Sequence, residues 1–323
     1  MTVRLLNKFS EEELDNYKQT LFYKDQVLSS YQYTDKSLAY YSEYFNNEYS
    51  NYSIVVFDEL QDPVLALYAF TKQPVFSHFG LPISVIESSF TSASKKNKAY
   101  HELIMKLNEI LTADHFEELK FYTNDFLCAE YFSKISENEI EYNSYIDLDL
   151  PKEQIKSNIR KSYKSLVNWG EKNLQTVLVD HNNTDYDKFI EFRDFHILTA
   201  GRKTRSDKSW DIQFESIKQN EAFLILGYLN DKIASGSFIM HGKDTAYYGL
   251  GVYDRELMTK NVAVGHYNIL SAVYHAKNIG LKSISLGYIN NVSTDEKEKN
   301  IFRFKTGFSN SMKVKNRYEV NLT

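Results

Sequence analysis

Positively charged side chains gather in three short stretches of the second half of the chain. Residues 152–172 contain six Lys or Arg and two Glu, residues 201–208 contain four and one Asp, and residues 301–317 contain five and no acid. The net charge of the whole chain is −5, so these are basic parts of an acidic protein. If the fold brings them together, they form an anion site that suits a phosphorylated small molecule or cofactor better than DNA. Alternatively, they are separate surfaces exposed to solvent.

Few other side chains have the spacing of a known catalytic site. The eight histidines show no H-x-H, H-x-x-x-H or H-E-x-x-H pattern, so we expect no metal. Walker A, G-x-G-x-x-G and G-x-S-x-G motifs are absent. The single cysteine, Cys128, lies in an apolar segment where an inert thiol is expected, and it excludes an internal disulfide.

The composition is that of a globular protein. A length of 323 residues suits one large or two medium domains, and 42% hydrophobic residues are enough for a core. We interpret the 25 Tyr and 21 Phe as core residues, since they are spread along the chain. The first thirty residues lack the apolar centre of a signal peptide, and no stretch reaches eighteen apolar residues. We therefore expect a cytoplasmic protein without a membrane span.

The first half of the chain alternates between helical and strand patterns. The patterns predict helices over 11–22, 37–49, 97–113 and 127–137, and strands over 52–58, 63–71, 119–124 and 140–149. This order predicts an α/β layer of sheet and helices. We place a boundary at Leu150–Pro151, which gives domains 1–150 and 151–323.

The second half begins with a segment that predicts one helix with two stripes. Ile155 and Ile159 begin its apolar stripe, whereas Lys156, Arg160 and Lys164 form a basic stripe. Further on, the pattern predicts a strand, a helix, a basic loop and another helix over 174–180, 184–199, 201–206 and 209–219. Residues 222–253 predict a three-stranded antiparallel meander, followed by a helix over 262–279 and a strand over 281–287.

Meander, helix and strand is the order of elements in the core of the GNAT acyltransferase fold. Residues 151–312 resemble the second GNAT-like domain of FemAB-type acyltransferases and of related single-chain acetyltransferases. The shared features are the basic segment 159–174, the T-x-x-R loop at 199–202 followed by Arg205, the meander and the F-K-x-x-F motif at 304–308. The resemblance implies an α/β (α+β type) fold with tandem GNAT-like domains and mixed sheets flanked by helices.

Two features depart from the family pattern. The chain lacks the long coiled-coil arm that accompanies the branch using aminoacyl-tRNA. The R/Q-x-x-G-x-G/A loop of enzymes that use acetyl-CoA is replaced by residues 255–266, which contain one glycine.

Three side chains are candidates for catalysis of acyl transfer to an amine, a reaction that needs a stabilised oxyanion and a path for a proton. The resemblance implies that Lys305 stabilises the oxyanion or orients the donor; without the motif it would be a solvated lysine on a terminal strand. Tyr248 could protonate a leaving thiolate, or it could be a core residue. Asp254 could accept a proton from the amine, or it could cap a turn.

Five residues are candidates for binding the acceptor. Arg202 and Arg205 suit bidentate recognition of phosphate or carboxylate, or else form a basic surface loop. Lys161 and Lys164 are further candidates for the same anion, or else face solvent. Phe304 precedes Lys305 in the motif.

Five residues are candidates for binding the acyl donor. Gly249 and Gly251 would let the donor approach the third meander strand closely, or else allow packing under a helix. Val264 and Gly265 could present backbone N–H groups to a pyrophosphate at the start of the next helix. His266, in the first turn of that helix, could be a base or a donor contact, although a lone histidine there is more often structural.

We therefore expect a bacterial N-acyltransferase of the GNAT superfamily. It would move an acyl group, with acetyl from acetyl-CoA as the first candidate, to an amine of an amino sugar, a sugar nucleotide or a cell-envelope glycan precursor. No tightly bound cofactor is expected, because the acyl donor is a co-substrate. The first alternative is aminoacyl transfer from a charged tRNA to a peptidoglycan or glycan amine. The second alternative is a pair of GNAT-like domains that binds a ligand without catalysis.

Overall fold

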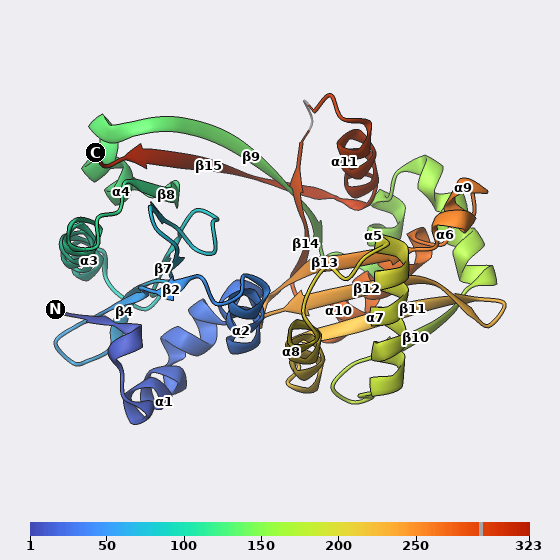
Figure 1. The fold of residues 1–323 in the computed structure, drawn as a ribbon, viewed down its shortest axis with the longest axis horizontal. Helices are drawn as coiled ribbons and strands as arrows, with labels where there is room; N and C mark the ends of the chain where they lie inside the picture. Colours follow the sequence, from blue (N-terminus) through green and yellow to red (C-terminus); the bar gives the residue numbers. More distant parts are fainter. Residues whose placement is uncertain (291–292) are drawn as a thin grey trace. The chain divides into compact units, whose positions relative to one another are not determined.

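The structure, a computed structural model, describes residues 1–290 and 293–323 (Figure 1). The chain forms two compact units, and neither is continuous in sequence. Unit 1 consists of Met1–Ser29, Phe45–Glu141 and Val314–Thr323, and unit 2 of Ser30–Tyr44 and Tyr142–Lys313. The divisions at 141/142 and 313/314 fall inside two long strands, β9 (Ile135–Asp147) and β15 (Ser311–Asn321). The expected boundary at Leu150–Pro151 therefore lies within unit 2, and the assignment of 1–150 and 151–323 as separate GNAT-like domains stays a prediction.

Unit 1 is built around a four-stranded antiparallel sheet and one long helix. The strand order is β1 (Thr2–Leu5), β3 (Ile54–Phe57), β4 (Pro63–Leu67) and β7 (Val85–Glu87). Helix α3 (Ala93–Ala113) packs against β3 and β4, and its Leu103 and Leu107 are fully buried in the core of the unit. The unit also contains α1 (Glu11–Gln19), α4 (Asp125–Tyr131), β2 (Ser50–Asn51), β5 (Phe70–Thr71), β6 (Val75–Phe76) and β8 (Glu118–Tyr122).

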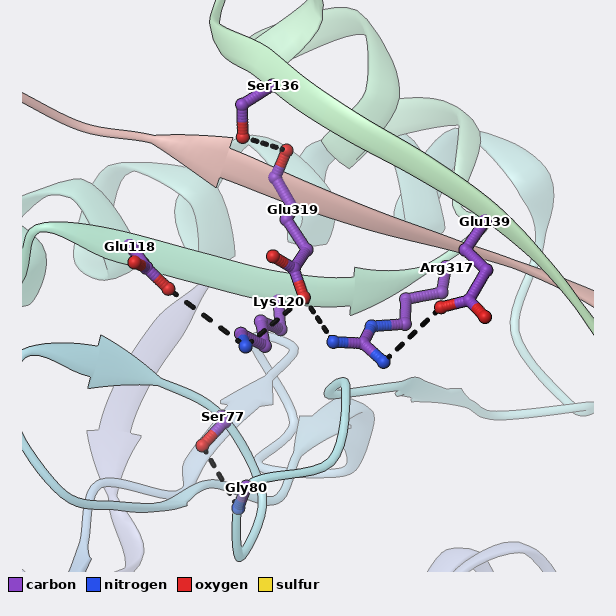
Figure 2. A network of polar contacts seen from close by, with 8 residues as sticks. All are labelled: Ser77, Gly80, Glu118, Lys120, Ser136, Glu139, Arg317 and Glu319. Atoms are coloured by element: carbon purple, nitrogen blue, oxygen red, sulfur yellow. Dashed lines mark hydrogen bonds and ion pairs between the residues drawn. The ribbon is translucent and has the colours of Figure 1, made fainter. Parts of the chain in front are cut away.

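A network of ion pairs links strand β8 to residues 317–321 of β15 (Figure 2). Lys120 and Glu319 are directly opposed on the two strands, with Lys120 Nζ 3.1 Å from Glu319 Oε1. Arg317 also pairs with Glu319, and its Nη1 lies 3.6 Å from Glu139 Oε2. Opposite charges at facing positions stabilise the pairing of two strands, so this cluster fixes the last strand of unit 1 in its register.

Unit 2 contains the meander and the helices that cover it. The strand order is β10 (Gln175–Val179), β11 (Ala222–Leu229), β12 (Lys232–His241), β13 (Thr245–Tyr253), β14 (Ser283–Ile289) and residues 142–147 of β9. All neighbours are antiparallel except β13 and β14, which are parallel. The predicted meander is confirmed, because its two tight turns and strand residues are local signals.

Helices cover both faces of this sheet, so alternate residues of β11 belong to two cores. Phe223 and Ile225 pack with α10 (His266–Asn278), next to α6 (Lys161–Asn173). Leu224 and Leu226 pack in the other core, with α7 (Tyr186–Ala200) and α8 (Asp207–Lys218). A strand buried on both faces is nearly all apolar, as the sequence AFLILGYL is. The chain also forms α2 (Asp35–Tyr44), α5 (Lys152–Asn158), α9 (Arg255–Thr259) and α11 (Glu296–Phe308).

The prediction that Ile155 to Lys164 lie on one helix is wrong. The segment forms two helices, α5 and α6, because the backbone at Arg160 is extended (φ −45°, ψ 135°) and its N–H donates to the carbonyl of Gly307 at 2.9 Å. Lys156 and Lys164 therefore lie on different helices and do not form one stripe. The apolar positions were predicted correctly, since Ile155 and Ile159 are both buried.

The first half contains more strands than the sequence predicts. The four predicted helices correspond to α1, α2, α3 and α4, and three predicted strands to β3, β8 and β9. The predicted strand 63–71 is divided into β4 and β5, and β1, β2, β6 and β7 were not predicted. Most of these missed strands have only two to four residues, too few for a period of two to show.

Candidate active site

Strands β13 and β14 separate partway along their length. They pair only between Thr245–Tyr247 and Ser283–Ser285, although both strands continue beyond this point. Strand β13 has a bulge at Gly249, because Phe238 of β12 faces Leu250 whereas Ile239 faces Tyr248. A bulge leaves one residue out of the ladder and bends its strand. Strand β14 has a similar irregularity between Ser285 and Gly287.

Lys305 lies beside this separation, on helix α11. Its Nζ donates a hydrogen bond to the carbonyl of Tyr288 at 2.9 Å. Burial lowers the pKa of the Lys305 ammonium, because desolvation disfavours the charged form. Gly287 has a φ of +84°, and a Cβ at this glycine would lie 3.3 Å from Lys305 Nζ and 3.3 Å from Tyr247 Cε2. The structure thus places a partly desolvated cation next to Gly287 and Tyr247.

A cluster of tyrosines surrounds Tyr247. Tyr31 stacks on Tyr247 with 4.8 Å between ring centroids and 8° between planes. Tyr41 lies close to both, and burial raises the pKa values of Tyr31, Tyr41 and Tyr247, so their hydroxyls stay protonated. Sequence reasoning missed Tyr31 and Tyr41, because residues 30–44 join unit 2 from the first half of the chain. The signal was present as five tyrosines within residues 31–44.

The two arginines of the T-x-x-R loop have different surroundings. Arg202 is exposed, just after Gly201 ends α7 in a left-handed conformation (φ 68°). The Arg205 guanidinium lies over three aromatic rings, 4.7 Å from the centroid of Trp210, 5.9 Å from that of Tyr44 and 6.0 Å from that of Tyr40. Its Nε and Nη1 are buried and have no hydrogen-bond partner among residues 1–290 and 293–323. Unpaired buried donors of this kind are suited to an anion that enters from outside.

Phe304 points into an aromatic cluster. Its ring centroid lies 5.4 Å from that of Phe308, 5.6 Å from His266 and 6.1 Å from Tyr253. His266 also makes an edge contact with Tyr163 at 4.5 Å. Burial lowers the pKa of His266 to about 4, so the imidazole is neutral near pH 7. The structure gives Phe304 and His266 packing contacts.

Tyrosine side chains cover two of the three glycines that were predicted to bind the donor. A Cβ at Gly265 would lie 2.7 Å from Tyr253 Cε1, and a Cβ at Gly251 would overlap the Tyr248 hydroxyl. The hydroxyls of Tyr248 and Tyr253 contact each other, and burial raises the pKa of Tyr248 to about 12. A Cβ at Gly249 would lie closest to the end of the Met240 side chain, at 3.1 Å, and would make only ordinary contacts with Phe238 O and Tyr247 Cδ1.

Four other residues that were predicted to belong to the site either make hydrogen bonds within the protein or lie on the surface of α6. The Val264 N–H donates to the carbonyl of Val262 at 3.0 Å, and its side chain is buried. The Asp254 carboxylate accepts from the Leu257 N–H at 2.9 Å and thus caps α9, which was the alternative interpretation. Lys161 is exposed and Lys164 half-buried on the first turn of α6. Lys305 is therefore the predicted catalytic residue with the most suitable position.

Comparisons with known proteins identify the fold. No family model and no curated protein matches the sequence. A crystal structure of FemX superposes with a TM-score of 0.68 at 12% identity, over 100% of this chain and 98% of FemX. The chain has the fold of FemX. The predicted fold class and the resemblance to FemAB-type proteins are confirmed at the level of the fold.

Two further structures match this chain at lower similarity. L-PGS from Bacillus licheniformis has a TM-score of 0.58 at 10% identity, over 97% of this chain and 93% of that one. A tandem GNAT protein from the clavulanic acid biosynthesis pathway has a TM-score of 0.51 at 11% identity, over 85% and 83%. A tandem GNAT architecture was the one that the sequence predicted.

Among residues 1–290 and 293–323, no three His, Cys, Asp or Glu side chains are grouped in a way that could hold a metal ion. Over the same residues, no helix has both the length and the apolar character needed to cross a bilayer.

Proposed function

We propose that the protein is an N-acyltransferase that uses the gap between β13 and β14. The supporting observation is the position of Lys305, whose ammonium lies beside Gly287 where the two strands separate. In the reaction, an amine nitrogen attacks the acyl carbonyl carbon, and the ammonium stabilises the oxyanion that forms. The oxyanion then collapses, the bond to the leaving group breaks, and the leaving group takes the proton that the amine loses.

The proposed acceptor is a phosphorylated amine, such as an amino-sugar nucleotide or a cell-envelope glycan precursor. Arg205 supports this class, because two of its buried nitrogens have no partner within the described residues. Arg202, exposed in the same loop, is a second contact for the phosphate. Guanidinium groups bind phosphate oxygens in bidentate fashion.

Two acyl donors are candidates. Acetyl-CoA is the donor of GNAT acetyltransferases, and here it would require Tyr253 to move away from Gly265. An aminoacyl-tRNA is favoured by one specific observation: the Val264 N–H and the Gly265 surface are already occupied by protein groups. A donor that has no pyrophosphate to bind at the start of α10 needs neither the Val264 N–H nor the surface of Gly265.

Calorimetric titration with acetyl-CoA and with desulfo-CoA separates the two donors. Micromolar binding that needs the pyrophosphate supports acetyl-CoA, and amino-sugar nucleotides are then screened for thiol release. No binding at millimolar concentration, together with binding of a charged tRNA that weakens steeply with salt, supports the aminoacyl donor. Ligand binding without release of product from either donor would contradict the enzyme and support a binding module.

With the donor known, Lys305→Ala tests the site. We expect turnover to fall by about 10²–10³-fold while KM changes little, because the ammonium acts on charge that develops in the transition state. Lys297→Ala, on an exposed position of the same helix, is the matched control. Unchanged turnover in Lys305→Ala would remove this residue from the mechanism.

A further inference from the structure

Two hydrogen-bond donors face the same point above Gly287. A Cβ built on Gly287 would lie 3.3 Å from Lys305 Nζ and 3.6 Å from Tyr247 Oη. Both groups therefore approach the same side of Gly287, beside the place where β13 and β14 separate. A side chain at this position would crowd both groups, and the φ of +84° is one that residues other than glycine rarely adopt.

The Tyr247 hydroxyl is held in place from two directions. Its backbone lies at the last paired position of β13 with β14, opposite Ser285, and also pairs with Met240 of β12. Its ring is stacked on Tyr31. Burial raises the pKa of Tyr247, so its hydroxyl stays protonated near pH 7 and can donate a hydrogen bond to an acceptor. A donor fixed in this way needs little reorganisation when charge develops beside it.

The Lys305 ammonium is oriented by the backbone around Gly287. One of its three protons is donated to the Tyr288 carbonyl. The Gly287 N–H donates a hydrogen bond to Ser285 Oγ at 3.1 Å. This bond stabilises the irregular part of β14 between Ser285 and Gly287. Two ammonium protons thus remain for other acceptors.

We propose that Tyr247 is a second catalytic residue, which shares the oxyanion with Lys305 above Gly287. This inference rests on the proposed acyl transfer. When the amine nitrogen bonds to the carbonyl carbon, the π electron pair moves to oxygen, and the Tyr247 hydroxyl and Lys305 ammonium both donate hydrogen bonds to it. When the pair returns, the bond to the leaving group breaks, and that group receives the proton from the amine. Neither Tyr247 nor Lys305 loses its own proton.

Tyr247→Phe removes one donor and keeps the stacked ring. We expect kcat to fall by about 10²-fold with KM within about threefold of wild type, as for removal of one oxyanion donor. Tyr41→Phe is the matched control, because Tyr41 belongs to the same tyrosine cluster, and it should change kcat by less than threefold. A Tyr247→Phe enzyme with wild-type kcat would overturn the inference.

A second measurement uses no acyl donor. The lysines are labelled by reductive ¹³C-methylation, and the NMR signal of Lys305 is assigned by its loss in Lys305→Arg. The pKa of Lys305 is then measured by pH titration of this signal, with and without millimolar methylphosphonate, a tetrahedral oxyanion. Binding above Gly287 should raise the Lys305 pKa in wild type, and the apparent affinity should fall at least fivefold in Tyr247→Phe. A response without turnover from any donor would contradict the proposed function and leave the two-donor site supported. Equal responses in wild type and Tyr247→Phe would contradict the site itself.

Discussion

Phe304 and Lys305 are neighbours on helix α11, yet they belong to regions of opposite character. Phe304 lies among Tyr253, His266 and Phe308, in a cluster held by ring contacts. Lys305 lies beside Gly287, where the surroundings are a backbone carbonyl and a tyrosine hydroxyl. One short motif thus provides a packing side chain and, at the next position, a charged side chain next to a second hydrogen-bond donor.

The glycines of the two regions show the same contrast. Gly265 and Gly251 lie directly beneath tyrosine side chains, so their lack of a Cβ is used for packing. Gly287 faces an ammonium and a hydroxyl, so its lack of a Cβ lets two hydrogen-bond donors approach the same side of the backbone. A glycine in a GNAT-like sheet is therefore no guide to the ligand site until its neighbours are known. The comparison makes four predictions about stability, from the largest effect to the smallest.

Phe304→Ala should destabilise the protein strongly. Truncating a Phe in a packed cluster costs about 2–4 kcal/mol of the free energy of unfolding, allowing for the partial exposure of this ring. Lys305→Ala is the neighbouring control and should cost less than about 1 kcal/mol, because it removes a partly desolvated charge. Urea unfolding of both variants measures the difference. Equal losses would mean that the two regions are not distinct.

Gly265→Ala should destabilise by about 1–3 kcal/mol, because its Cβ would meet the Tyr253 ring at 2.7 Å. The backbone at Gly265 has a φ of −92°, so conformational strain does not contribute. Gly249→Ala is the control, since its Cβ meets the flexible end of Met240. Thermal unfolding compares the two, and an equally stable Gly265→Ala would show that Tyr253 moves freely.

The neutral His266 predicts a pH dependence of stability. Its pKa is about 4 in the fold, below the ordinary value of 6.5, so the unfolded chain binds the proton more tightly. Stability from this residue is complete above pH 6.5 and is lost as the pH falls from about 6.5 to 4, by at most about 1.4 kcal/mol per pH unit. His266→Phe should flatten this part of the curve, measured by urea unfolding at several pH values. An unchanged slope would locate the proton uptake elsewhere, for example at His196, whose pKa is also lowered to about 4.

Asp254→Ala should have the smallest effect, about 1 kcal/mol, from loss of the cap on α9. Asp254→Ser keeps a capping oxygen and should have both the stability and the turnover of wild type. Low turnover in a stable Asp254→Ser enzyme would instead identify Asp254 as the base. Urea unfolding and steady-state kinetics on the same samples decide between the two roles.

The sequence predicted those features that depend on nearby residues. The meander over 222–253 was recognised from its turns and strand patterns, and Lys305 from a five-residue motif. The break at Arg160 was missed because its cause is a hydrogen bond to Gly307, far along the chain. Tyr31 was missed for the same reason, since its stacking on Tyr247 joins the two halves of the sequence. Gly287 and its bulge depend on strand register, which no local pattern contains.

The discontinuity of unit 1 has a consequence for synthesis on the ribosome. Residues 314–323 complete its last strand, and Val320 is fully buried in its core. These residues are translated after all of residues 142–313, which belong to unit 2. Unit 2 can therefore begin to fold during translation, whereas unit 1 waits with part of its core uncovered until β15 has left the exit tunnel. Chaperones that shield nascent chains would thus be needed mainly by the half that is made first.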